Sequence, residues 1–251
     1  MAIAAHLRVD WSKPWLAPYR QIGQAVECEL ALGLVVASAL NKQLDRSPIH
    51  NAAGPLRFAT ADAATPTEAY EAFIARTAQV PTRDNLHDLF NGLVWLTFPL
   101  LKRQLNELQA RQIALSGVGA QRGAVRDRLT LFDENGALWR APPMLVDALR
   151  RRDWHGLFLT HRAVWQQAQL TIVGHALLEK LTVPRKAITA HVWIVPEGVD
   201  AETWRVDARA PEHPAALAHL PLPVLGIPGW WPANESEGFY DDAVVFRPAR
   251  G

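Results

Sequence analysis

The stretch "NLHDLFNGLVWLTF", residues 85–98, decides the fold, because the other elements have to be arranged around it. It carries one full charge, on Asp88, and few other polar side chains. On a helical wheel of about 100° per residue, its leucines, Phe90 and Val94 cover a wide arc and leave a narrow polar sector. A helix of this kind is expected to lie inside the protein, with neighbours on most of its faces.

Two polar side chains of this helix, His87 and Asn91, are four residues apart and therefore lie on one face, about one turn from each other. If they are buried, each needs hydrogen-bond partners, because an unpaired buried polar group costs roughly 1–3 kcal/mol. One interpretation is structural: the pair ties the helix to a neighbouring loop or strand. The other is functional: the pair lines a pocket. The residues alone leave both interpretations open.

A second pair with the same spacing, His175 and Glu179, lies in "VGHALLEKL". His175 follows a glycine directly after a predicted strand, the position at which helix N-termini meet clefts in α/β units. Helical histidine and glutamate at this separation can bind a metal together, or act as a base with its orienting carboxylate. The alternative is an ordinary helix ion pair, worth a few tenths of a kcal/mol.

Helical periodicity and turn signals predict further elements on both sides of the central segment. Helices are expected at residues 19–44 with a break near Glu29, at 65–77, 84–98 and 99–115, two or three within 142–168, one from His175, and one within 200–220. Strands are expected near residues 56–59, 169–173 and 187–196.

The strongest β signal is "DRLTLFDENGALWRA", residues 127–141. Its Asn135-Gly136 pair is typical of a type I′ turn, so the stretch is predicted to form a β-hairpin. Asp133 and Glu134 would then flank the tip of the hairpin. Turn tips are usually solvated, which makes a role in a site the less favoured interpretation of these two acids.

Together these elements predict an α+β fold, a predominantly helical single domain over residues 1–251 with a small β-hairpin and short-strand component. Residues 1–15 are expected to form an extended N-terminal arm. Residues 220–251 are rich in proline, glycine and aromatic residues. This long C-terminal coil is expected to wrap the body in an ordered form, because its large rings need burial.

Composition excludes several classes of protein. The net charge of +1 gives no long-range field toward nucleic acid or anionic lipid, and the short arginine clusters at 121–128 and 149–153 are predicted to be solvated. Cys28 is the single cysteine of the chain, which excludes an internal disulfide and fits a reducing compartment. No signal peptide or membrane span is predicted, so a cytoplasmic location is expected.

Four long motifs carry a resemblance to a known family: "VPTRDNLHDLFNGLVWLTFPLLKRQLN", "RDRLTLFDENGALW", "GHALLEKLTVPRKAITAHV" and "LPVLGIPGWWPANESEGFYDDAVVFRP". From about Trp11 to Pro248, the chain resembles a family of uncharacterised proteobacterial proteins grouped as a domain of unknown function. The resemblance implies a cytoplasmic bacterial protein. It implies no activity and contributes no catalytic residue.

The working hypothesis for function is a hydrolase whose site combines His87 and Asn91 of the central helix with His175 and Glu179 of the second helix. Two of these side chains would hold a divalent metal, of unspecified identity, while another acts as general base. This hypothesis requires the two helices to pack face to face.

Other classes of protein stay open. A binding or scaffold protein, with a protein partner or a second copy of the chain, would show an exposed apolar patch. A small-molecule carrier would show an enclosed cavity without ionisable groups. A nuclease related to the HNH type is disfavoured, because the spacing from His87 to Asn91 is too short for that metal motif.

Overall fold

The computed structural model describes residues 7–61, 68–116, 123–199, 203–204, 206 and 217–248. Its N-terminal part contains a 3-10 helix (Pro14–Tyr19), α1 (Arg20–Ala31), α2 (Val36–Arg46), β1 (His50–Asn51), β2 (Gly54–Pro55), β3 (Arg57–Thr60), α3 (Tyr70–Thr77), β4 (Gln79–Thr82), α4 (Leu86–Thr97) and α5 (Pro99–Ser116). The fold is α+β and mainly helical, which confirms the predicted class.

The C-terminal part completes the fold with longer strands and short helical turns. It contains α6 (Ala124–Asn135), β5 (Gly136–Arg140), α7 (Pro143–Arg151), a π-helical turn (Gly156–Thr160), a 3-10 helix (Arg162–Gln167), β6 (Gln169–Ile172), α8 (His175–Lys180), β7 (Thr189–Ile194), β8 (Leu220–Pro223) and 3-10 turns at Val224–Gly226, Pro232–Glu235 and Glu237–Asp241.

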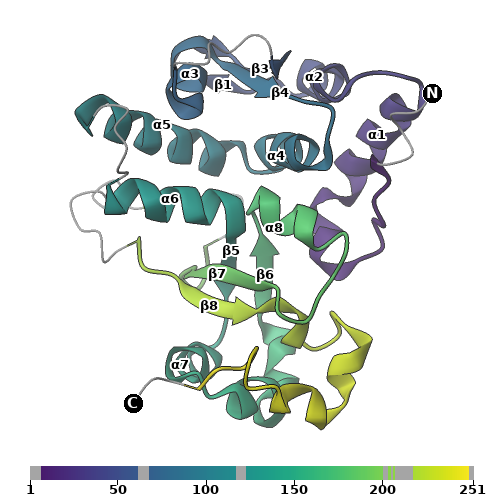
Figure 1. Cartoon of the computed structure of the whole chain (residues 1–251), viewed down its shortest axis with the longest axis vertical. Coiled ribbons are helices and arrows are strands. Elements are labelled where there is room, and N and C mark those ends of the chain that lie inside the picture. The colour runs from purple at the N-terminus through teal and green to yellow at the C-terminus, as the bar shows by residue number, and fades with distance from the viewer. Residues whose placement is uncertain are drawn as a thin grey trace.

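The two parts are stacked along the long axis of the molecule. In Figure 1, α2, α3 and the strands β1, β3 and β4 lie at one end, and α7 and the yellow C-terminal segment lie at the other. Between them, α4 and α5 face α6 and α8 (Figure 1). Helix α4 packs directly against α8 and also against α2.

Helix α4 is buried, as its narrow polar sector predicts. The side chains of Phe90, Leu93 and Val94 are completely buried. The side chain of Asn85 caps the helix by accepting a hydrogen bond from the main-chain N–H of Asp88 at 2.8 Å. Neighbouring elements therefore surround the segment at residues 85–98 and fix the direction of its polar side chains.

The largest sheet lies beneath this central layer of helices. Its strand order is β6-β5-β7-β8, with β5 antiparallel to β6 and parallel to β7, and with β7 antiparallel to β8. Strands β3 and β4 form a separate parallel pair, and β1 and β2 a short antiparallel one. Strand β6 leads into α8, so the sheet carries the start of α8 to the junction with α4 (Figure 1).

The predicted hairpin at residues 127–141 is wrong. Residues up to Asn135 belong to α6, and the strand β5 begins at Gly136. Gly136 has a φ of −81°, so it does not adopt the positive φ that a type I′ turn needs. Leu129 and Phe132 are both completely buried, and their separation of three residues is that of a helix face.

The C-terminal segment is ordered over the residues described, as expected, but it is not entirely coil. Residues 220–223 form β8 at the edge of the large sheet. Asn234 is fully buried and donates hydrogen bonds to the carbonyls of Leu225 and Ile227 at 2.8 and 2.7 Å.

The strands β1, β2, β4 and β8 were not predicted from the sequence. Residues 1–6 of the predicted arm and most of the helix expected within 200–220 lie outside the described residues.

Candidate functional site

Two histidines from different helices meet at the junction between α4 and α8. The Nε2 atom of His87 lies 3.1 Å from the Nε2 atom of His175. Their ring centroids are 4.5 Å apart, and the rings are close to perpendicular. His175 is buried, whereas His87 keeps about a third of its side chain exposed, 31%. The predicted face-to-face packing of the two helices therefore brings these two rings into contact.

The other ring nitrogens fix the tautomers of the two histidines. Nδ1 of His175 lies 2.8 Å from the main-chain carbonyl of Asp133, and Nδ1 of His87 lies 3.0 Å from the carboxylate of Glu179. Carbonyl and carboxylate oxygens only accept hydrogen bonds, so each Nδ1 carries the proton. In the neutral form of both rings, the two Nε2 atoms then face each other with lone pairs. This arrangement repels unless a cation lies between them.

A carboxylate completes the cluster. Oε1 of Glu134 lies 3.7 Å from Nε2 of His175. Three possible ligand atoms, one each from His87, Glu134 and His175, lie within 4.8 Å of one another. Two histidines and one glutamate are a ligand set of catalytic zinc sites, and tetrahedral bonds of about 2.0–2.1 Å place two nitrogens roughly 3.4 Å apart. The observed separation of 3.1 Å is close to that value.

Gly174 allows His175 to approach Glu134. A Cβ atom on Gly174 would lie 2.5 Å from the main-chain nitrogen of Gly136 and 2.6 Å from the Cα atom of Asn135. The N–H groups of Val173 and Gly174 both donate to the carbonyl of Gly136, at 3.0 and 2.8 Å. The turn before α8 is thus pinned against the end of α6, where the acids lie.

Ion pairs beside the cluster neutralise three neighbouring acids. They join Lys102 to Asp133 at 2.6 Å, Arg83 to Asp88 at 3.0 Å and Arg126 to Glu71 at 3.6 Å. The prediction that the arginine cluster at 121–128 is solvated is therefore wrong for Arg126, which is buried because it pairs with Glu71.

The pKa values of the cluster reflect these surroundings. Burial alone would raise the pKa of Asp133, but Lys102 and His175 together lower it. Burial raises the pKa of Glu134, which has no lysine or arginine partner among the described ion pairs. Burial also lowers the pKa of His175 to about 4. The site therefore combines a neutral buried imidazole with a half-buried carboxyl group whose charged form is disfavoured by burial.

A cavity of about 450 Å³ opens beside the cluster. Its lining includes all three candidate ligands together with Tyr70, Asn91, Gln109 and Thr130. The side-chain amide of Asn91 donates to the hydroxyl of Tyr70 at 2.9 Å, and its carbonyl oxygen is buried without a hydrogen-bond partner. A small molecule could reach the cluster through this cavity, whose volume is within the usual range for ligand sites.

The four residues predicted from the sequence have different places in the structure. His87, His175 and Glu179 are brought together, but Glu179 bonds to His87 rather than to His175. Asn91 lines the same cavity and bonds to Tyr70. Sequence reasoning missed Asp133 and Glu134, because the predicted hairpin placed them at a solvated tip. A helical interpretation of residues 124–135 would have directed attention to them.

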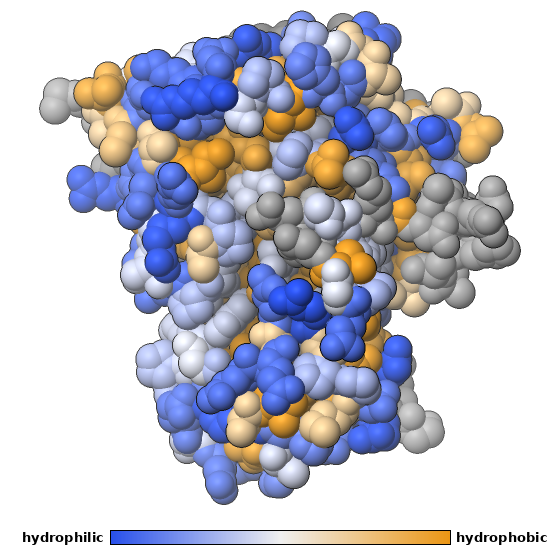
Figure 2. All heavy atoms as spheres, turned by 180° about the vertical axis from the view of Figure 1, so that it is seen from behind, coloured by the Kyte–Doolittle hydropathy of each residue, from blue (hydrophilic) through white to orange (hydrophobic). Residues whose placement is uncertain are grey.

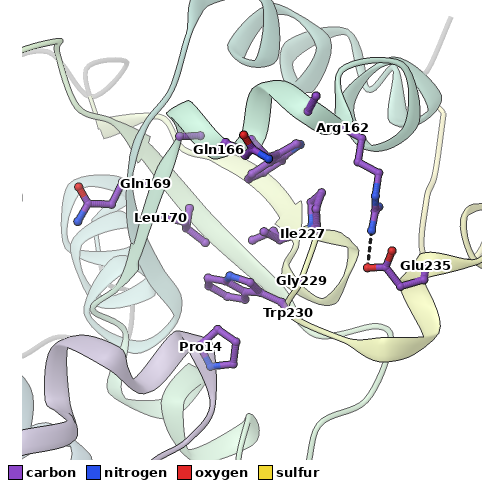
Figure 3. Close-up of a pocket in the computed structure, with 13 residues that line it drawn as sticks. Pro14, Arg162, Gln166, Gln169, Leu170, Ile227, Gly229, Trp230 and Glu235 are labelled. Carbon is purple, nitrogen blue, oxygen red and sulfur yellow. Dashed lines mark hydrogen bonds and ion pairs between the residues drawn. The ribbon is translucent and has the colours of Figure 1, made fainter.

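A larger cleft lies at the other end of the molecule, with a volume of about 750 Å³ (Figure 3). It is lined by Pro14, Leu170, Ile227, Trp230 and polar side chains that include two glutamines. The guanidinium of Arg162 forms an ion pair with the carboxylate of Glu235 at 2.6 Å (Figure 3). The lining residues of this cleft include no histidine. The cavity at α4 is therefore the better candidate for chemistry.

Comparison with known proteins identifies the family. The family model described as "Protein of unknown function (DUF3025)" matches residues 56–250, and the chain belongs to this family. No curated protein and no solved structure matches the chain. Among the described residues, no helix combines the length and the apolar character needed to cross a bilayer.

Proposed function

We propose that this protein is a metal-dependent hydrolase, with a divalent cation held by His87, His175 and Glu134. The proposal rests on the contact between the Nε2 atoms of the two histidines. The Nδ1 atom of each ring already donates a hydrogen bond, so neither Nε2 atom carries a proton when the ring is neutral. A cation removes the repulsion between the two lone pairs. Burial lowers the pKa of His175 to about 4, so a second proton, on Nε2, is disfavoured near neutral pH.

Each surrounding residue has a role in this proposal. Glu179 and the carbonyl of Asp133 orient the two imidazoles, as outer carboxylate and carbonyl groups do in metal sites. Lys102 holds the carboxylate of Asp133 and so keeps its carbonyl in place. A divalent ion supplies Lewis acidity, which polarises a substrate carbonyl and acidifies water. The cavity beside the cluster leaves room for the substrate.

The other classes of protein fit the site less well. A carrier cavity would lack ionisable groups, but this one is lined by histidine, aspartate and glutamate. A binding module would expose a large apolar patch. The most exposed large hydrophobic residues, Leu32, Leu115, Val183 and Val244, lie on separate segments. On the face shown in Figure 2, hydrophilic residues predominate and hydrophobic ones form small groups between them.

Elemental analysis of untagged protein purified without chelator tests the proposal. We expect one divalent transition metal ion per chain and a melting temperature that falls when EDTA is added, because a ligand that binds the folded state stabilises it. His175→Ala and His87→Ala should each lose the ion. The metal-loaded protein would then be screened for hydrolysis.

The matched control is His155→Ala, which removes an exposed histidine outside the cluster. This variant should keep the metal content and the EDTA response of the wild type. A metal-free protein whose melting temperature ignores EDTA would contradict the proposal, and the two rings would then share a proton. Equal metal loss in His155→Ala and His175→Ala would contradict it as well.

A cytoplasmic location is part of the proposal. It is supported by the single cysteine, which fits a reducing compartment. Cys28 is exposed in the structure, so an oxidising compartment would leave its thiol open to pairing between chains. Fractionation of cells followed by detection with an antibody tests the location. Recovery of the protein in a membrane or extracellular fraction would contradict it.

A further inference from the structure

The charges that line the α4 cavity limit the substrates it can bind. Its wall carries the carboxylates of Glu71, Asp88, Asp133 and Glu134. The guanidinium of Arg83 is bound by Asp88 through Nε and Nη2, at 3.0 and 3.1 Å. Arg83 is the one arginine or lysine in the described lining of this cavity. A phosphate group would therefore meet several carboxylates and no unpaired cation of the protein.

Apart from the two histidines, the remaining polar side chains in the cavity wall are uncharged. Thr130 donates to the side-chain carbonyl of Gln109 at 3.1 Å. The hydroxyl of Tyr70 accepts from Asn91 and donates to the carbonyl of Pro81 at a long 3.5 Å. Burial, with the negative charges of Asp88 and Asp133, raises the pKa of Tyr70, so its hydroxyl stays protonated. It is a neutral donor whose one hydrogen bond in this structure is long.

We infer that the cavity binds a small uncharged acyl compound, an amide or an ester, and that Tyr70 donates a hydrogen bond to it. This inference rests on the proposed metal site. Neutral hydrogen-bonding side chains around a polarising cation suit a carbonyl group, whereas the side chains that recognise phosphate are typically cationic. Hydrolysis joins the oxygen of water to the carbonyl carbon and breaks the bond to nitrogen or oxygen. One proton of the water passes to that leaving atom.

Visible absorption of the cobalt(II)-loaded protein provides the test, because ligand binding at the ion changes the spectrum. The probes are acetohydroxamate, added as its weak acid, an acyl compound that is uncharged in solution near neutral pH, and inorganic phosphate. We expect acetohydroxamate to shift the cobalt bands with saturation. At about 10 mM, even a ligand with a binding free energy of about −4 kcal/mol would occupy most of the sites. Phosphate at this concentration should leave the cobalt bands unchanged.

Tyr70→Phe separates recognition from metal binding. Loss of one neutral hydrogen bond should weaken acetohydroxamate binding about threefold to tenfold. The cobalt spectrum without probe should be unchanged, because Tyr70 is not a ligand. Tyr240→Phe is the matched control, since its hydroxyl bonds to the carbonyl of Gly226 at the far end of the fold. It should leave acetohydroxamate affinity at the wild-type value.

The outcomes separate the two proposals. If the protein takes up no cobalt, the proposed function and this inference are both overturned. If cobalt binds and phosphate shifts the bands in the millimolar range, the metal site stands and the inference about substrate class is overturned. Wild-type affinity for acetohydroxamate in Tyr70→Phe would also overturn the inference, because Tyr70 would then make no contact with the acyl group.

Discussion

The carboxylate of Glu179 accepts a hydrogen bond from Nδ1 of His87 at 3.0 Å, across the interface between α8 and α4. Outer partners of this kind fix the tautomer of a ligating histidine, and their loss typically costs 10–100-fold in metal affinity. We expect Glu179→Ala to weaken metal binding by about that factor, measured by competition with a chelator. Glu197→Ala, at an exposed position, should keep the wild-type affinity. Equal affinities in the two variants would show that Glu179 does not orient the ring.

The close approach of Gly174 to Gly136 leads to a prediction for stability and metal content together. Gly174→Ala forces the turn before α8 away from α6, because the new methyl group would overlap main-chain atoms. We expect a loss of about 1–3 kcal/mol in the free energy of unfolding and a reduced metal content. Gly123→Ala is the control, since nothing lies within 4 Å of its added Cβ. Similar urea midpoints for both variants would contradict the packing described at this turn.

His191 and His219 lie outside the candidate site, and we expect them to make the stability of the protein depend on pH. Their ring centroids are 5.1 Å apart, and burial is the main cause that lowers the pKa of each. The unfolded chain therefore binds protons that the folded protein does not. Stability is full above the unfolded pKa of about 6.5, and is lost as the pH falls below it.

Urea unfolding at pH 7.5, 6.5 and 5.5 measures this effect. The double variant His191→Gln and His219→Gln should lose less stability between pH 7.5 and 5.5 than the wild type, because two of the groups that take up protons on unfolding are absent. The comparison is made in the presence of a chelator, so that metal binding does not contribute. Identical pH profiles of the two proteins would refute the assignment.

Asn234 holds the C-terminal segment together and connects it to Arg162 in the rest of the protein. Besides its two donated hydrogen bonds, its side-chain oxygen lies 3.3 Å from the guanidinium of Arg162. We expect Asn234→Ala to cost about 2–4 kcal/mol, because the carbonyls of Leu225 and Ile227 lose their donor. The same variant should release the C-terminal segment to limited proteolysis. Ser236→Ala, at an exposed position two residues away, should behave as the wild type.

Helix positions were largely predictable from the sequence because burial follows the helical period. The apolar arc of residues 85–98 predicted a buried helix, and α4 has those contacts. The pairs His87 with Asn91 and His175 with Glu179 directed attention to α4 and α8, which pack against each other. Their partners could not be predicted, because a hydrogen bond such as His87 to Glu179 joins residues 92 positions apart. Spacing along one helix carries no information about such a contact.

The hairpin error shows why Glu134 was missed. The Asn135-Gly136 pair has the composition of a tight turn, and local signals of this kind compete with helical periodicity. Tertiary contacts decided the outcome, since the carbonyl of Gly136 accepts from Val173 and Gly174.

The family match begins at residue 56, yet the hydroxyl of Tyr19 donates a hydrogen bond to the carbonyl of Ile172 at 2.7 Å. The residues that precede the family match therefore contact the matched segment directly.

The separation of the two histidines along the chain has a consequence for the order of folding. His87 and His175 are 88 residues apart, so their meeting requires a long loop to close. Contacts of this range are slow to form, because the entropy of loop closure is lost before the contact stabilises the chain. The ion proposed above would therefore bind a site that the rest of the fold has already assembled. It should slow unfolding and leave the folding rate unchanged, in contrast to small domains that fold around their metal.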